Sequence, residues 1–191
     1  MRCLVLGWLL GVSTIFCRAQ PGDATFQLIL IGGEGGVESK DSLQRVLQHL
    51  PPSTLPSAVI YLGDNLNPMG LPGPEDKARK NDEHILVNQI SMASGFGDIY
   101  FMAGNHDWKN GRHEGLHYRN NQQRFLDSIR HPKVHFLPRD GCPGPEEIHL
   151  SEDLVLVILD TQWFLHPWDK PAGGKESLRF KDGRRCHDSP G

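Results

Sequence analysis

Three apolar runs divide the first part of the chain, and each of them ends at a glycine. They are Phe26–Ile31, Ser57–Leu62 and Asp98–Ala103. Continuous apolar runs of this length, bounded by glycine, are typical of strands that are covered on both faces. The pattern therefore predicts three buried strands.

The stretches between and after these runs have helical periodicity, with apolar residues three and four positions apart. The first predicted helix begins at Ser39 or Asp41 and is stopped by Pro51-Pro52. Two more are predicted at about residues 76–92 and 118–130. Strands that alternate with helices in this way predict an α/β fold, with a parallel sheet and crossover helices.

The pattern changes after residue 137. Two strand-like segments, 147–150 and 154–160, are separated by Ser151-Glu152-Asp153, which predicts a hairpin. From Lys170 onward the chain is rich in glycine and charge and has few apolar residues. We expect this tail, residues 170–191, to be disordered.

Residues 1–19 have the layout of a secretory signal peptide. Arg2 precedes an apolar run, and Cys17-Arg18-Ala19 resembles a small-x-Ala cleavage site before Gln20. An uncleaved membrane anchor and lipid attachment at Cys17 are the alternatives. The sequence therefore predicts export to a periplasmic or extracellular location, with no membrane span after the signal is removed.

The composition fits one folded domain of 191 residues, or a fragment of a larger one, with 38% hydrophobic and 23% charged residues. A net charge of -3 and the lack of a basic stripe argue against a nucleic-acid partner. After cleavage of the signal, Cys142 and Cys186 would remain. In an oxidising compartment they could form a disulfide or stay as two free thiols, and both possibilities are open.

Polar clusters follow the second and third predicted strands. In parallel α/β sheets, ligands bind beyond the carboxyl ends of the strands, where Asp64 and the group Asn105-His106-Asp107 fall. A carboxylate and an amide oxygen are hard ligands for divalent metals. His106 could move a proton, and Asp107 could fix its tautomer. An ordinary turn is the alternative explanation for Asp64 and its neighbour Asn65.

The segments YLGDN (61–65) and FMAGNHDW (101–108) resemble the second and third signature blocks of the calcineurin-like metallophosphoesterases, which include the purple acid phosphatases. The resemblance spans about Phe26 to Trp168, and LDTQWFLHPWDKP (159–171) resembles a subgroup of predicted exported phosphoesterases. It implies a partial phosphoesterase domain over residues 20–169. Such a domain is the N-terminal half of a two-layer β-sandwich flanked by helices, with a βαβαβ start followed by a hairpin.

The resemblance also implies roles for the strand-end residues. Asp64 would bridge two divalent ions (manganese, iron or zinc), and Asn105 would bind the second of them. His106 would contact the phosphate and protonate the leaving oxygen, while Asp107 would orient His106. Two such ions activate a hydroxide for in-line attack on a phosphoester. Asn65 is expected in a turn or in a hydrogen bond behind the site rather than on a metal.

Two features depart from the family pattern. Gly33 stands where the family carries its first metal-binding aspartate, and Glu34, one position later, is the remaining candidate ligand in that loop. No Gly-His-x-His block follows, and the later histidines are isolated or lie among glycines: His113, His117, His149, His166 and His187. The chain therefore reads as the first half of a phosphoesterase domain, which is truncated, degenerate or completed by a partner.

Two functions follow from these observations. The first is metal-dependent hydrolysis of a phosphoester whose type the sequence does not specify. The alternative is a catalytically inactive exported module that binds phosphate or another ligand. A third interpretation, a nucleotide site on the glycine-rich segment 32–36, lacks both G-x-G-x-x-G spacing and a following Lys-Ser/Thr pair.

Overall fold

The structure is a computed structural model that describes residues 24–33, 47, 49–50 and 54–168, together with two short strand segments at 4–5 and 15–16. Four strands form a parallel sheet in chain order: β3 (Gln27–Ile31), β4 (Ser57–Tyr61), β5 (Asp98–Phe101) and β6 (Val134–Phe136). Helix α2 (Arg79–Ala93) connects β4 to β5, and α3 (Gly115–Ile129) connects β5 to β6. This arrangement confirms the predicted α/β fold with a parallel sheet.

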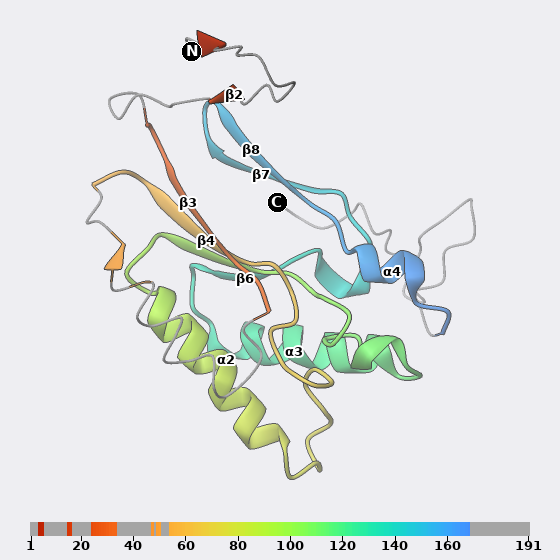
Figure 1. Ribbon diagram of the computed structural model, residues 1–191. Helices are drawn as coiled ribbons and strands as arrows, with labels where there is room; N and C mark the ends of the chain where they lie inside the picture. The colour runs from red at the N-terminus through yellow and green to blue at the C-terminus, as the bar shows by residue number, and fades with distance from the viewer. Residues whose placement is uncertain are drawn as a thin grey trace, which may run out of the picture.

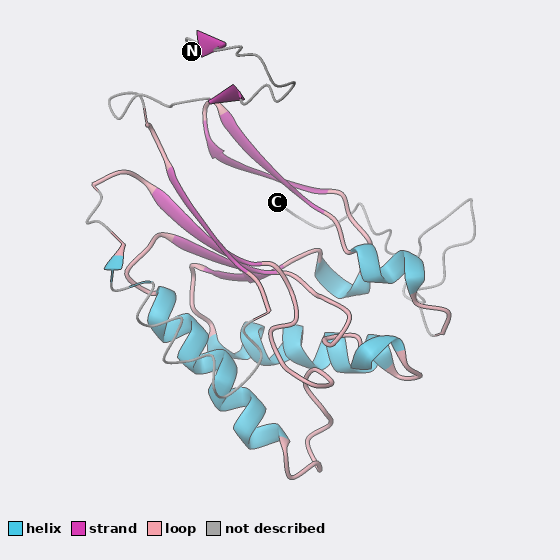
Figure 2. Cartoon of the chain, in the orientation of Figure 1, coloured by secondary structure: helices cyan, strands magenta, loops and turns pink. Residues whose placement is uncertain are grey.

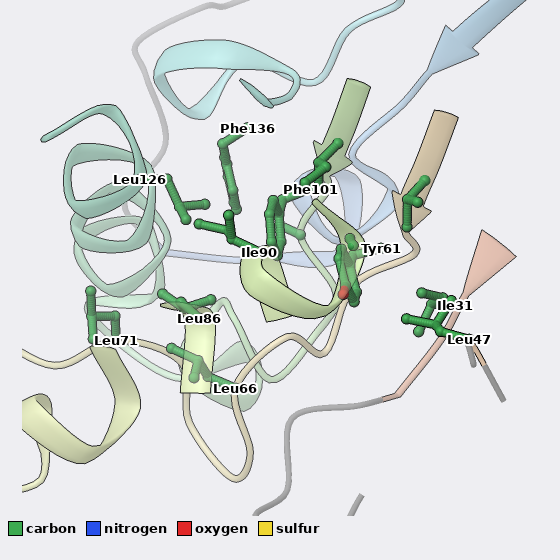
Figure 3. Packing of buried hydrophobic residues seen from close by; sticks show 14 of the residues in the cluster. Ile31, Leu47, Tyr61, Leu66, Leu71, Leu86, Ile90, Phe101, Leu126 and Phe136 are labelled. Atoms are coloured by element: carbon green, nitrogen blue, oxygen red, sulfur yellow. The ribbon is translucent and has the colours of Figure 1, made fainter. Parts of the chain in front are cut away.

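Helices α2 and α3 cover one face of this sheet (Figures 1 and 2). The strands contribute Val59, Tyr61, Ile99 and Phe101 to that face, and all four are buried in the main core. The core continues through the helices and the loop after β4, as Leu86, Ile90, Leu126, Leu66 and Leu71 show (Figure 3). The rings of Tyr61 and Phe101 stack with centroids 4.6 Å apart, which aligns the ends of β4 and β5.

The opposite face of the sheet packs against an antiparallel hairpin, β7 (Glu146–Ser151) and β8 (Leu154–Ile158). The hairpin confirms the prediction for this segment. Its inner side, with Ile148 and Leu156, packs on Ala58, Ile60 and Tyr100 in a second, smaller core. The structure therefore has two β layers, and a short helix, α4 (Thr161–Leu165), follows the hairpin.

The prediction that β3 is covered on both faces is wrong. Leu28 and Leu30 lie on the hairpin side of the sheet, yet 38% and 57% of their surfaces are exposed. Leu62, at the end of β4, is 46% exposed. The second core is formed by β4 and β5 together with residues next to the hairpin. The hairpin therefore covers the middle of this face of the sheet and leaves the β3 side exposed to solvent.

Two helix boundaries also differ from the prediction. The Asp76 side chain accepts a hydrogen bond from the Ala78 backbone N–H (2.8 Å), which forms a turn where the helix was expected to begin. Helix α3 begins earlier than predicted, at Gly115. His113 therefore lies before this helix, and His117 lies within it.

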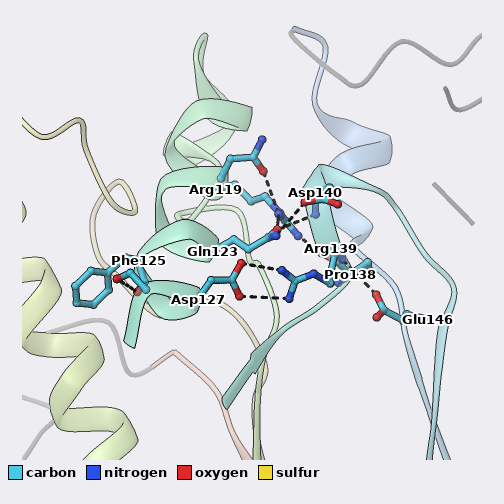
Figure 4. A network of polar contacts seen from close by, with 10 residues as sticks. Arg119, Gln123, Phe125, Asp127, Pro138, Arg139, Asp140 and Glu146 are labelled. Carbon is cyan, nitrogen blue, oxygen red and sulfur yellow. Dashed lines mark hydrogen bonds and ion pairs between the residues drawn. The ribbon is translucent and has the colours of Figure 1, made fainter. Parts of the chain in front are cut away.

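A polar network joins α3 to the connection between β6 and β7, which contains the short 3-10 helix η2 (Arg139–Gly141) (Figure 4). Arg139 pairs with Asp127 at 2.7 Å, and Gln123 donates to Asp140 at 3.1 Å. Arg119 is fully buried and donates to Gln123 and to the Pro138 carbonyl. Its guanidinium also lies 4.6 Å from the centre of the Phe136 ring. Burial lowers the pKa of Arg119 to about 10, so it remains a cation at neutral pH.

Several predictions concern residues outside the described ranges. These are Glu34, the tail 170–191, most of the predicted signal segment and most of the first helix, of which Leu47 and His49 are helical. Within the signal segment, β1 (Leu4–Val5) pairs antiparallel with β2 (Ile15–Phe16). Cys142 is disulfide-bonded, and the other three cysteines lie outside the described ranges. No helix in the described part of the chain is both long enough and apolar enough to cross a membrane.

Candidate functional site

The loops after β4 and β5 meet in direct contact. The two strands are neighbours in parallel register, with Tyr61 opposite Phe101, so their carboxyl ends lie side by side. Asp64 Oδ1 accepts a hydrogen bond from the backbone N–H of His106 at 3.0 Å. Gly104 has room for this contact only because it lacks a side chain: an added Cβ would clash with the Asp64 carboxylate and lie 2.5 Å from the Asp64 backbone nitrogen. The structure thus brings together the two clusters that the sequence places at neighbouring strand ends.

The first predicted strand also reaches this edge. The Gly33 backbone N–H lies 3.4 Å from the Gly63 carbonyl oxygen, so the loop after β3 begins beside the loop after β4. Gly33 has a φ of +70°, and a Cβ built there would meet no atom of the described residues within 4 Å. The position at which the family pattern has an aspartate is therefore open and adjacent to the loop that carries Asp64.

Asp107 does not orient His106, and that prediction is corrected. Its carboxylate is fully buried and accepts hydrogen bonds from backbone N–H groups of Gly104 (2.8 Å), Asn65 (3.3 Å) and Leu66 (3.3 Å). Burial raises the pKa of Asp107 to about 7, while the hydrogen bonds from these backbone groups act in the opposite direction. The buried Asp107 carboxylate therefore joins the two strand-end loops through its hydrogen bonds.

The ring of His106 is positioned by a different group. Its Nδ1 lies 2.7 Å from the Pro68 carbonyl oxygen. A carbonyl oxygen can only accept, so Nδ1 carries the hydrogen in this contact. Nε2 then carries no hydrogen in the neutral ring, and it makes no hydrogen bond to another described residue. One ring nitrogen of His106 is thus bonded to Pro68, and the other is available for acid–base chemistry.

The two asparagines have different environments. Asn65 is buried and donates its side-chain amide to the Met102 carbonyl (2.7 Å) and towards Asp107 (3.4 Å). It therefore makes the predicted hydrogen bonds behind the site. Asn105 is exposed and donates its amide N–H to Asn110 (3.0 Å), which leaves its carbonyl oxygen available to a ligand.

The chemistry of this donor set suits part of a divalent-metal site. Asp64 keeps one carboxylate oxygen outside its bond to His106, and Asn105 keeps an amide oxygen; both are hard donors. Among residues 24–33, 47, 49–50 and 54–168, no three histidine, cysteine, aspartate or glutamate side chains come together as a group that could hold a metal ion. Two hard oxygen donors, from Asp64 and Asn105, are therefore present on these two loops.

Among the later histidines that the structure describes, three pack against other aromatic rings, including His117 beside Tyr118, and one is exposed. His166 is buried and its ring packs on Trp108, with centroids 4.8 Å apart. His113 contacts the Trp168 ring at 5.5 Å, and His149 is exposed on β7. His187 lies outside the described residues.

Sequence reasoning missed the part played by Trp108 and Asp160. The Trp108 indole N–H donates to Asp160 at 2.8 Å, and both side chains are fully buried. Both lie in segments that the family resemblance had singled out. Their pairing is hidden from a pattern search because 52 positions separate them in the chain.

The chain was compared with known proteins in three ways. A scan against protein-family models, a search of curated proteins and a search of solved structures each found no match. The family resemblance therefore remains a proposal that rests on the residues and the geometry of this chain.

Proposed function

We propose that this chain is a metal-dependent phosphoester hydrolase of the calcineurin-like type. The observation that carries the proposal is the meeting of two strand-end loops, which places Asp64 beside the backbone of His106 and next to Asn105. The carboxyl edge of a parallel sheet is where α/β proteins bind their ligands. The sheet and the hairpin layer agree with the two-layer sandwich that the resemblance implies.

The residues divide the chemistry between them. Asp64 and Asn105 would hold a divalent cation through oxygen atoms, and such ions supply Lewis-acid activation of a hydroxide and of the phosphoryl oxygens. His106 would donate a proton from Nε2 to the leaving alcohol oxygen. Asp107 would not touch the substrate; it would hold both loops in place.

A second function, non-catalytic binding of phosphate or a phosphorylated ligand, is favoured by one specific observation. Among the described residues at the meeting point of the two loops, Asp64 alone carries a carboxylate that is not fully buried, because Asp107 is buried on backbone amides and Gly33 has no side chain. One carboxylate and one amide bind a cation more weakly than the acidic clusters typical of hydrolytic two-metal sites. A weak site would bind without supporting turnover.

Metal content and turnover separate the two functions. The full chain would be purified, loaded with Mn²⁺ or Zn²⁺, and assayed with p-nitrophenyl phosphate. Bound metal with turnover, both lost in Asp64→Asn, supports the hydrolase. Binding of inorganic phosphate without turnover supports the binding module, and the absence of metal, phosphate and turnover contradicts both.

Gly33→Asp tests whether the missing carboxylate limits the site. We expect tighter Mn²⁺ binding in calorimetry, because the new side chain has open space beside the loop that carries Asp64. Gly33→Ala is the matched control, since it places a Cβ at the same φ of +70° without adding a carboxylate. Equal affinities of the two variants would show that Gly33 is not the position where a ligand is missing.

A further inference from the structure

Trp108 connects the strand-end site to the second layer of the fold. It follows His106-Asp107 directly, and its side chain is fully buried. The indole N–H donates to Asp160 Oδ2 at 2.8 Å, while the ring of His166 packs on the indole at a centroid distance of 4.8 Å. The segment from Asp160 to His166 therefore holds this ring both by a hydrogen bond and by ring packing.

Asp160 is itself held from several directions. Its backbone N–H donates to the Pro143 carbonyl at 2.9 Å. Its Oδ1 accepts from the Trp163 backbone N–H at 3.1 Å, which caps α4. Burial raises the pKa of Asp160, and the charge of the buried Arg119 opposes this change. Both carboxylate oxygens thus have fixed partners, so the acceptor that faces Trp108 has a defined position.

The backbone around Trp108 is equally constrained. Its carbonyl accepts from the Gly111 N–H at 3.0 Å. Gly115, the first residue of α3, passes so close that an added Cβ would lie 2.5 Å from the Trp108 carbonyl oxygen and 2.6 Å from His166 Cε1. The start of α3 and the ring of His166 therefore both pack closely against Trp108, whose backbone continues directly from Asn105 and His106.

We propose that Asp160 is a positioning residue for the strand-end site: through Trp108 it holds the loop from Gly104 to Trp108 in the conformation that places Asn105 and His106 beside Asp64. Its meaning for catalysis rests on the proposed function, but the positioning itself is measurable without metal or substrate. Asp160 touches neither the reacting atoms nor the metal donors. It acts from the N-terminus of α4, just after the hairpin, on the loop that follows β5.

Hydrogen exchange on the full chain tests this coupling. The amide N–H groups of Gly104 and His106 are bonded to Asp107 and Asp64 and report directly on the loop. Trp108→Phe removes the indole N–H donor together with part of the buried ring system, and it keeps an aromatic side chain at this position. We expect the protection of these two amides to fall about tenfold, the effect of losing a hydrogen bond to a charged group. The amides of Val59 and Ile60 in β4 serve as the internal control and should stay unchanged.

Asp160→Asn provides a second variant in case Trp108→Phe folds poorly, since the asparagine keeps one acceptor oxygen for the α4 cap. Loss of protection confined to Gly104 and His106 in either folded variant supports the proposal. Unchanged protection there, or an equal loss in β4, overturns it and makes Asp160 a purely structural group.

A Mn²⁺ titration of the same variants links the coupling to the proposed function. We expect the dissociation constant to rise several-fold in both variants relative to the unmodified chain, an effect that general stabilisation of the fold would not produce. If the unmodified chain binds no Mn²⁺, the proposed function fails, and the exchange data still decide whether Asp160 positions the loop. The two failures are therefore distinguishable.

Discussion

His106 and Asp107 are neighbours in the chain, but their side chains bind different backbone groups of the loop after β4. The His106 ring turns to the Pro68 carbonyl, whereas the Asp107 carboxylate turns inward to the backbone of Gly104, Asn65 and Leu66. The residue types at this strand end could be predicted from the sequence, because polar groups there suggest a site. Their hydrogen-bond partners could not be predicted from the sequence. These partners are backbone amides and carbonyls of a loop some forty positions away, and the pattern of residue types does not reveal them.

The available ring nitrogen of His106 leads to a specific prediction for the removal of this side chain. If the chain hydrolyses phosphoesters, His106→Ala should lower turnover by about 10²–10⁴-fold, the usual worth of general acid catalysis. The melting temperature should change little, because the side chain is only partly buried on a loop. Asn105→Ala is the control and should lose metal along with activity. A His106→Ala protein that unfolds easily but keeps its turnover would make the histidine structural.

Asp107 should give the folding stability a defined pH dependence. Burial raises its pKa from 3.8 to about 7 in the folded chain, so the folded state binds this proton more tightly than the unfolded state. The stability that results is fully present below about pH 4 and is lost as the pH rises towards 7. The free energy of unfolding of the metal-free protein, minus that of Asp107→Asn, should therefore fall across this range, by at most about 1.4 kcal/mol for each pH unit. Urea titrations at several pH values measure it, and a constant difference would mean that Asp107 is ionised throughout.

At the scale of elements, the close approach of two loops builds the site. Apolar runs and helical spacing are enough to predict the strands and helices that carry these loops, as β4, β5 and α3 show. They do not predict where α3 begins, because Gly115 is selected by its contact with Trp108 and His166 rather than by its weak intrinsic helix preference. The backbone contact at Gly104 cannot be predicted from the sequence for the same reason, because it depends on how two distant segments meet.

A pair of glycine substitutions tests the loop contact. Gly104→Ala should lower the free energy of unfolding by about 1–3 kcal/mol, because its Cβ would displace Asp64 or its backbone. Gly95→Ala is the matched control, since a Cβ at that position would meet no atom within 4 Å. Chemical denaturation of both variants gives the comparison. Equal stabilities would show that the two loops are not in contact in solution.

At the scale of the whole molecule, the hairpin layer covers only part of the sheet. The parallel sheet and the hairpin could each be predicted from local patterns, but how one packs on the other could not, because the run Phe26–Ile31 is apolar on both of its faces. In the structure, one of these faces lies against the helical core and the other is largely open. The difference is set by the position of the hairpin over β4 and β5, which is a tertiary property.

Substitutions that shorten a side chain to alanine should have unequal effects on stability in the two halves of this face. Ile60→Ala removes a buried side chain and should cost about 2–5 kcal/mol of stability. Leu30→Ala, at a position that is 57% exposed, should cost less than about 1 kcal/mol. Thermal or urea unfolding distinguishes these values. A cost at Leu30 as large as that at Ile60 would show that the open half of the face is covered in solution.

The central claim is that the loops after β4 and β5 form a divalent-metal site through Asp64 and Asn105. Calorimetric titration of the full chain with Mn²⁺ tests this most directly, with Asp64→Asn as the site variant. Asp98→Asn is the control, because Asp98 begins β5 at the opposite end of the sheet and undergoes the same change from carboxylate to amide. We predict that the unmodified chain and Asp98→Asn bind Mn²⁺ with equal affinity and that Asp64→Asn binds about tenfold more weakly or worse, as expected when a hard oxygen ligand loses its charge. Equal binding by all three proteins, or no binding by any of them, would contradict the claim.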